Sequence, residues 1–191
     1  MSTTLDDTHL TERGGRLVPG QLGSRRIAPK QVPLDYGPEK FSVRIYVLGR
    51  FNVEHRDAEL LPRSHKAPHK PLELLKALVA FGGREVSDET LAHALWPDAE
   101  GDRALVSLDV TVHRLRRFLR LPGVLALYDR KLTLDAHHCW VDCWAFEWLM
   151  QRADAALQLG DAGEVEIADL STQIESLYQG AFLGSDTPTP W

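Results

Sequence analysis

Residues 103–120, RALVSLDVTVHRLRRFLR, are the stretch that decides the fold. Its apolar residues recur at steps of three and four, the spacing that buries one face of a helix. These residues are Leu105, Leu108, Val112, Leu115 and Leu119. The opposite face, at about 100° per residue, holds Arg103, Ser107, Val110, Arg114 and Arg117. The stretch therefore predicts a helix that is seated on a core and offers a cationic face to a polyanion.

The composition is that of a soluble, folded chain. The 191 residues are 43% hydrophobic and 26% charged, enough for one core and a second small one. No apolar run reaches the roughly 20 residues that cross a bilayer, and the N-terminus, MSTTLDDTHL, has no signal-peptide core. The two cysteines are too few to frame a disulfide scaffold. We therefore expect a cytoplasmic protein without a membrane partner.

The net charge of -5 is spread unevenly along the chain. Residues 1–40 hold 6 Lys+Arg and 5 Asp+Glu, residues 41–135 hold 15 and 13, and residues 136–191 hold 1 and 9. The acidity thus belongs to the C-terminal third, while the middle of the chain is mildly basic. This division predicts two modules with different partners.

Residues 1–40 are expected to form a disordered N-terminal arm. They mix Gly, Pro, Arg, Ser and Gln without periodicity, so they cannot bury enough apolar surface to fold. Arg25, Arg26 and Lys30 could add non-specific attraction to phosphate, although a solvated tail without function is the simpler interpretation.

The order of elements that follows predicts an α+β fold of the winged-helix type. The alternation in SVRIYVLG, the run FNVEH and a third run near residues 59–61 indicate a small antiparallel sheet. Two helices come next, the first beginning at Pro71 and the second capped by Ser87. The arginine helix is therefore the third helix of the domain.

The segment after the arginine helix, VLALYDRKLTLD, is typical of a hairpin with a tight turn at Asp129 and Arg130. In a winged helix the third helix enters the major groove, and the hairpin, or wing, reaches a neighbouring backbone. The tip of this wing carries Arg130 and Lys131. The wing thus adds positive charge beside the arginine helix.

Several segments resemble a known family. The run LDVTVHRLRRFL is similar to the third-helix signature of OmpR/PhoB-type winged helices. More narrowly, VLGRFNV, LLKALVAFGGREVSDETLAHALWPDAE, WVDCWAFEWL and LYQGAFLGSD resemble bacterial transcriptional activators of the SARP type. In that family an OmpR-like winged helix precedes an all-helical bacterial transcriptional activation domain. The similarity covers about residues 42–186.

The resemblance implies a winged-helix DNA-binding domain at residues 41–136 and a helical extension at residues 137–191. The first expected helix of the extension is capped by Asp142, and its apolar face comprises Phe146, Leu149, Met150, Ala153 and Leu157. The second follows Asp161 and buries Ile167, Leu170, Ile174 and Leu177. Because the activation domain of the family continues through several helix pairs, we expect either a fragment or a minimal relative.

The resemblance also implies DNA contacts from the arginine helix and the wing. The expected DNA-binding residues are Arg103, Ser107, Val110, Thr111, Arg114, Arg117, Arg130 and Lys131. Arginine binds guanine bidentately or clamps a phosphate, and valine suits a thymine methyl. A solvated surface charge is the alternative for each arginine, but the capped helices before them and the basic hairpin after them favour DNA.

The segment HHCWVDCW holds zinc-ligand residue types at His137, His138, Cys139 and Cys143. A site closed within so short a segment needs a tight chain reversal. In the SARP-type pattern the two cysteine positions are ordinarily apolar, so the resemblance implies that both cysteines act as small hydrophobes. Metal binding by this cluster stays an open alternative, and we expect no cofactor. The motifs GxxxxGK, GxSxG and HExxH are absent from the sequence, so no enzymatic function is expected.

The sequence therefore predicts a sequence-specific, double-stranded DNA-binding transcriptional regulator, associated with the nucleoid. By resemblance we expect an activator that contacts RNA polymerase through residues 97–102 and the acidic C-terminal helices. A homodimer, or tandem binding on direct repeats, is expected from the family alone. The alternative is a winged-helix module that binds protein instead of DNA, which the acidic helices would suit.

Overall fold

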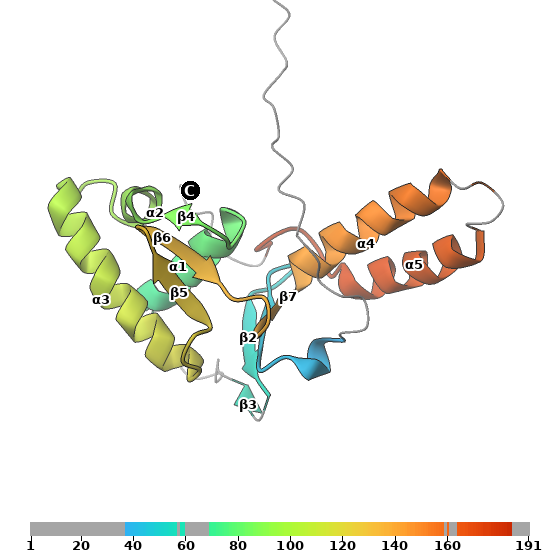
Figure 1. The fold of residues 1–191 in the computed structure, drawn as a ribbon, viewed down its shortest axis with the longest axis horizontal. Helices are drawn as coiled ribbons and strands as arrows, with labels where there is room; N and C mark the ends of the chain where they lie inside the picture. Colours follow the sequence, from blue (N-terminus) through green and yellow to red (C-terminus); the bar gives the residue numbers. More distant parts are fainter. Residues whose placement is uncertain (1–36, 57, 60–68, 159, 161–163, 185–191) are drawn as a thin grey trace, which may run out of the picture.

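The structure is a computed structural model that describes residues 37–56, 58–59, 69–158, 160 and 164–184. Most of the expected arm, with Arg25, Arg26 and Lys30, lies outside the described residues, as does Asp161. The expected α+β fold is confirmed (Figure 1). In chain order the elements are η1 (Pro38–Lys40), β1 (Val43–Tyr46), β2 (Asn52–His55), β3 (Ala58–Glu59), α1 (His69–Ala80), β4 (Val86–Ser87), α2 (Asp88–Leu95), α3 (Gly101–Leu119), β5 (Leu125–Tyr128), β6 (Lys131–Leu134), β7 (Cys139–Val141), α4 (Asp142–Leu157) and α5 (Glu164–Leu177).

The N-terminal sheet has the strand order β3-β2-β1-β7. In β1, buried Val43 and Ile45 alternate with half-buried Arg44 and Tyr46, as the period of two requires. The expected antiparallel pairing of β1 with β2, and of β2 with β3, is confirmed. The sequence did not predict that β7 would pair in parallel with β1. The sheet therefore contains strands from both of the expected domains.

The first two helices have the expected end signals. α1 begins at His69 rather than at Pro71, so the proline occupies its first turn, where a missing N–H costs least. The chain leaves α1 through two glycines, and Gly83 has a φ of 74°, which suits glycine. Ser87 is confirmed as the N-cap of α2, because its side chain accepts a hydrogen bond from the N–H of Thr90 at 3.1 Å.

α3 packs against α1 and α2 through one apolar stripe. The expected stripe is confirmed at Leu108, Val112, Leu115 and Leu119, but Leu105 is only partly buried. Ala104, a smaller side chain, is buried in its place at the start of the helix. The stripe fixes the rotation of α3 about its axis, and with it the face that solvent meets.

The expected hairpin is confirmed as β5 and β6, with β4 paired to the other edge of β6. Leu127 lies opposite Leu132, in the register that the leucine pattern predicts. Asp129 and Arg130 have φ values of 47° and 56°. Two positive values in a two-residue turn indicate a type I′ turn, whose twist matches that of the paired strands. The hairpin lies at the same end of the molecule as α3 (Figure 1).

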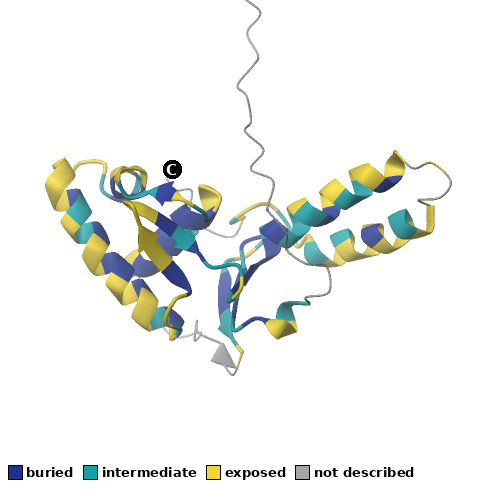
Figure 2. Ribbon diagram, viewed as in Figure 1, coloured by how far each residue is buried: buried dark blue, intermediate teal, exposed yellow. Residues whose placement is uncertain are grey.

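α4 and α5 form a helical hairpin that projects from the winged helix (Figure 1). Val141 is the N-cap of α4, so the expectation that Asp142 occupies the capping position is wrong. The face of α5 was predicted correctly, and its centre, Leu170, is buried against α4. Met150 and Leu157 are 40% and 63% exposed, contrary to expectation, because α5 covers only one side of α4 (Figure 2). No helix in the described part of the chain is long and apolar enough to span a membrane.

Two connections hold the helical hairpin to the N-terminal sheet. The buried carboxylate of Asp142 accepts hydrogen bonds from the N–H groups of Val47, at 2.8 Å, and Leu48, at 2.9 Å. After α5 the chain returns, and the N–H of Leu183 donates to the carbonyl of Val47 at 2.7 Å. Both connections meet the turn between β1 and β2. The domain division between residues 136 and 137 stays a prediction, and β7 crosses it in space.

Candidate nucleic-acid interface

The outer face of α3 carries cationic and apolar side chains together. Arg103, Arg114 and Arg117 are exposed on this face. Val106 and Val110, which are 65% and 47% exposed, lie one helical turn apart among the arginines. Because the opposite face is buried in the core, α3 presents these side chains from a fixed scaffold (Figure 2).

Arg114 and Arg117 have no ion pair or hydrogen bond with any residue that the structure describes. Arg103 differs, because its Nε lies 3.5 Å from Oε2 of Glu100. Both side chains of that pair are about 80% exposed, and pairs of this kind contribute about 1 kcal/mol at most. Arg103 can therefore exchange its partner for a phosphate at small cost.

Arg116 has a structural role on the flank of the helix. Its Nε donates a hydrogen bond to the carbonyl of Leu125 at 3.0 Å. Leu125 is the first residue of β5, so Arg116 ties α3 to the base of the wing. The spacing of the wing from α3 is thus set by a contact within the protein.

Two expected contact residues on α3 lie differently from the prediction. Thr111 is 4% exposed, and its Oγ1 donates to the carbonyl of Ser107 at 2.7 Å. The DNA contact that the resemblance implied for Thr111 does not fit this burial, because the side chain belongs to the margin of the buried stripe beside Val112. Ser107 is half-buried, and its Oγ donates to the carbonyl of Arg103 at 2.9 Å. The oxygen of Ser107 remains available only as an acceptor.

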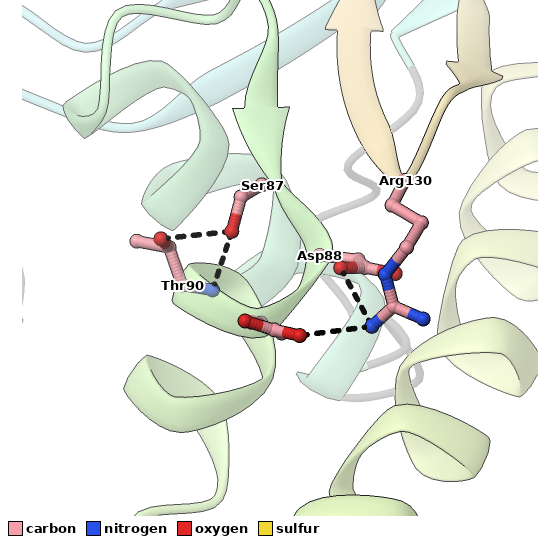
Figure 3. A network of polar contacts seen from close by, with 5 residues as sticks. Ser87, Asp88, Thr90 and Arg130 are labelled. Atoms are coloured by element: carbon pink, nitrogen blue, oxygen red, sulfur yellow. Dashed lines mark hydrogen bonds and ion pairs between the residues drawn. The ribbon is translucent and has the colours of Figure 1, made fainter.

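The turn of the wing is fixed to the start of α2 (Figure 3). Nη2 of Arg130 lies 3.3 Å from Oδ1 of Asp88 and 3.2 Å from Oε1 of Glu89. The N–H of Asp88 also donates to the carbonyl of Arg130 at 2.9 Å. Next to these contacts, Ser87 and Thr90 close the N-terminus of α2. Arg130, which the sequence assigned to DNA, is therefore already paired within the protein.

Lys131 and Tyr128 are two exposed side chains of the wing that could contact a ligand. They lie opposite each other at the end of the hairpin. Lys131 is exposed and has no ion pair with a described residue, and Tyr128 is 85% exposed. The sequence reasoning missed Tyr128, because the leucines decided the hairpin. The sequence does contain a signal for it. Tyr128 is an aromatic residue that alternates with the leucines of β5, so it lies on the opposite face of the strand, and it is close in sequence to Arg130 and Lys131.

The histidines and cysteines of HHCWVDCW do not converge on one point. Both histidines turn to Asp135, with His137 Nδ1 at 2.9 Å and His138 Nδ1 at 3.0 Å from its carboxylate oxygens. Burial raises the pKa of both thiols, Cys139 and Cys143, which disfavours the thiolate that binds metals. Among the residues that the structure describes, no group of three or more His, Cys, Asp or Glu could hold a metal ion.

Comparison with protein families identifies the central domain. Residues 63–125 match the family described as "Transcriptional regulatory protein, C terminal". The matched stretch, 63 of the 191 residues, is similar to that family. The match contains all of α1, α2 and α3, and so includes the helix that carries the exposed arginines.

A solved structure of Mycobacterium tuberculosis EmbR, in complex with a low affinity phosphopeptide, has a similar fold. The TM-score is 0.56 at 22% sequence identity, and the alignment covers 75% of this chain and 38% of that chain. This chain therefore spans about two fifths of the length of the EmbR chain. The family match supports the expected resemblance to a transcriptional-regulator winged helix, and the likeness to EmbR shows a shared fold. No curated protein matches.

Proposed function

We propose that this transcriptional-regulator winged helix binds double-stranded DNA in a sequence-specific way, with α3 in the major groove and the wing on the backbone. The observation that carries the proposal is the pair Arg114 and Arg117, both exposed and without a partner among the described residues. An arginine fork with no internal acceptor is free to bind guanine or phosphate. The major groove is about 12 Å wide, which admits one α-helix.

The geometry supports a division of labour among the candidate residues. Arg103, Ser107, Val110 and Arg114 lie on the outer face of α3, and we assign them to base edges and adjacent phosphates. Arg117, in the last turns of α3, and Lys131, on the wing, are assigned to the backbone. Arg130 is assigned to positioning the wing, because its guanidinium is held by Asp88 and Glu89.

We further propose that the regulator is an activator that contacts RNA polymerase. Residues 97–102, between α2 and the first turn of α3, are exposed throughout. The helical hairpin supplies an anionic surface, because Arg152 is its only arginine or lysine and is paired with Glu166. Binding of two copies to direct repeats is part of the same proposal.

A protein-binding module without DNA affinity is the second candidate. The observation that favours it is the exposed apolar surface of the helical hairpin, which includes Leu157, Val165 and Tyr178 at 63%, 86% and 51% exposure. The helical hairpin also carries acidic residues, among them Asp154, Glu164 and Glu175, so the partner would be a basic protein surface with apolar contacts. DNA binding separates the two candidates.

The deciding experiment is selection of bound sequences from a random duplex pool, followed by affinity measurements on the selected and a scrambled duplex. We expect an enriched site, and we expect the double variant Arg114→Ala/Arg117→Ala to lose it. The matched control is Arg50→Ala, which removes an exposed arginine from the turn after β1, away from α3. If no duplex binds at low salt, the protein-binding candidate replaces this proposal. If both variants bind like the wild type, the DNA-binding surface is not the outer face of α3.

A further inference from the structure

Two exposed valines lie in the cationic face of α3. Val106 and Val110 are the large hydrophobic residues of this helix that are most exposed, at 65% and 47%. They are four residues apart, so they stand one above the other on the helix surface. Arg103 precedes them and Arg114 follows them on the same side. The sequence reasoning placed Val110 on this face but missed Val106.

A single exposed valine needs no explanation, because apolar atoms make up much of any protein surface. A stacked pair between exposed arginines is different, since valine is a weaker helix former than the long polar residues that suit a solvated position. Neither valine can donate or accept a hydrogen bond. In the major groove, the apolar group that the base edges present is the C5-methyl of thymine. The pair therefore has one chemically matched target on DNA.

We propose that Val106 is a specificity-determining residue that contacts the C5-methyl of a thymine, adjacent to a second thymine methyl contacted by Val110. Four residues at a rise of 1.5 Å separate the two side chains by about 6 Å along α3. This distance corresponds to roughly two base-pair steps of about 3.4 Å. The bound site thus contains two thymines about two base pairs apart, in either strand. The inference rests on the proposed function, since it requires α3 to lie in the major groove.

The test replaces each thymine of the selected duplex, one at a time, by deoxyuridine. This change removes the methyl group and keeps every hydrogen-bonding atom of the base. For the wild type, we expect two positions at which the affinity falls, by about fourfold each, the worth of one buried methyl-sized group. For Val106→Ala, replacing thymine by deoxyuridine should no longer lower the affinity at one of these positions and should still lower it at the other. We call this loss of affinity the uracil effect.

Val165→Ala is the matched control, because Val165 is 86% exposed on α5, away from α3. It should keep both uracil effects. Alanine favours helix more than valine does, so Val106→Ala should unfold at the same temperature as the wild type or a higher one. A selected site without thymine, or a Val106→Ala variant that keeps both uracil effects, would overturn this inference alone. Failure to select any duplex would overturn it together with the proposed function.

Discussion

The guanidinium of Arg130, in the turn of the wing, lies 3.3 Å from the carboxylate of Asp88, in the first turn of α2. A backbone hydrogen bond of 2.9 Å runs between the same two residues. The pair holds the tip of the hairpin against the helix that precedes α3. The orientation of the wing is therefore set within the domain, and Lys131 at its tip has no ion pair with any residue that the structure describes.

The two basic residues of the wing should behave differently when each is replaced. Lys131→Ala should lower the slope of log K against log salt by about one unit and leave the sequence preference intact, as expected for a lost phosphate contact. Arg130→Ala should change the salt slope by less than half as much, because the guanidinium of Arg130 forms ion pairs with Asp88 and Glu89. A full unit of slope lost in Arg130→Ala would show that this arginine binds phosphate after all.

Arg114→Ala should weaken binding to the selected site by about 1 to 3 kcal/mol and relax the preference for one base pair, as expected for a groove contact. The measurement is the affinity for the selected duplex and for duplexes that carry each single base-pair change. An equal loss on every duplex would instead place Arg114 on a phosphate.

Gly83→Ala should destabilise the domain more than Gly82→Ala. Both residues have positive φ, 74° and 95°, so each substitution strains the backbone by about 1 to 2 kcal/mol. Only at Gly83 would the added Cβ collide with the indole of Trp144, whereas nothing lies within 4 Å at Gly82. Overpacking adds about 1 to 3 kcal/mol to the cost at Gly83. Denaturant unfolding should show this difference, and equal midpoints would contradict it.

Asp142→Asn should loosen the attachment of the helical hairpin to the N-terminal sheet. Burial raises the pKa of Asp142, although the N–H groups of Leu48, Val47 and Cys143 oppose the shift by donating to the carboxylate. An asparagine has one acceptor oxygen, so it leaves a buried N–H unpaired, at a cost of about 1 to 3 kcal/mol.

Amide hydrogen exchange measures the effect of Asp142→Asn directly. Val47 and Leu48 should exchange faster in this variant, while the amides of α3 keep their protection. The control Asp154→Asn removes the same charge from an exposed position of α4 and should change nothing at Val47. Unchanged exchange at Val47 and Leu48 in Asp142→Asn would contradict the role of Asp142 in attaching the helical hairpin to the N-terminal sheet.

The segment between β6 and β7, in which Asp135 binds His137 and His138, should contribute stability that depends on pH. Burial alone would raise the pKa of Asp135, but hydrogen bonds from the His137 backbone and from the His137 and His138 rings lower it below the ordinary 3.8. A carboxyl group with a lowered pKa stabilises the fold above its ordinary pKa and loses that contribution as the pH falls through the folded value.

The free energy of unfolding of the wild type, compared with that of Asp135→Asn, gives the measurement. The difference between them should be constant above about pH 5 and shrink below 3.8. A difference that stays the same from pH 6 down to acid unfolding would rule out this role of Asp135.

The elements of the winged helix could be predicted because each has a local signal. Ser87 caps the helix that begins beside it, and the turn at Asp129 has the two-residue length of a hairpin. The position of β7 beside β1 could not be predicted, and neither could the contact of Asp142 with Val47, which are 95 positions apart in the chain. Periodicity shows which face is buried and not what covers it.

The candidate site was predictable to the same extent. The period of the apolar stripe placed Arg114 and Arg117 correctly on the outer face. Thr111 was expected to contact DNA from the family resemblance alone, whereas the spacing of about 100° per residue places it next to the buried stripe, where the structure has it. The partners of Arg130 were missed because Glu89 is 41 positions away in sequence and adjacent only in the fold.

Interference by guanine N7 methylation on the selected duplex tests most directly whether α3 lies in the major groove, because N7 faces that groove. We predict that methylation within one segment of the major groove blocks binding of the wild type, and that one guanine in this segment ceases to matter for Arg114→Ala. Interference confined to adenine N3 in the minor groove, or a pattern identical in wild type and Arg114→Ala, would contradict the account.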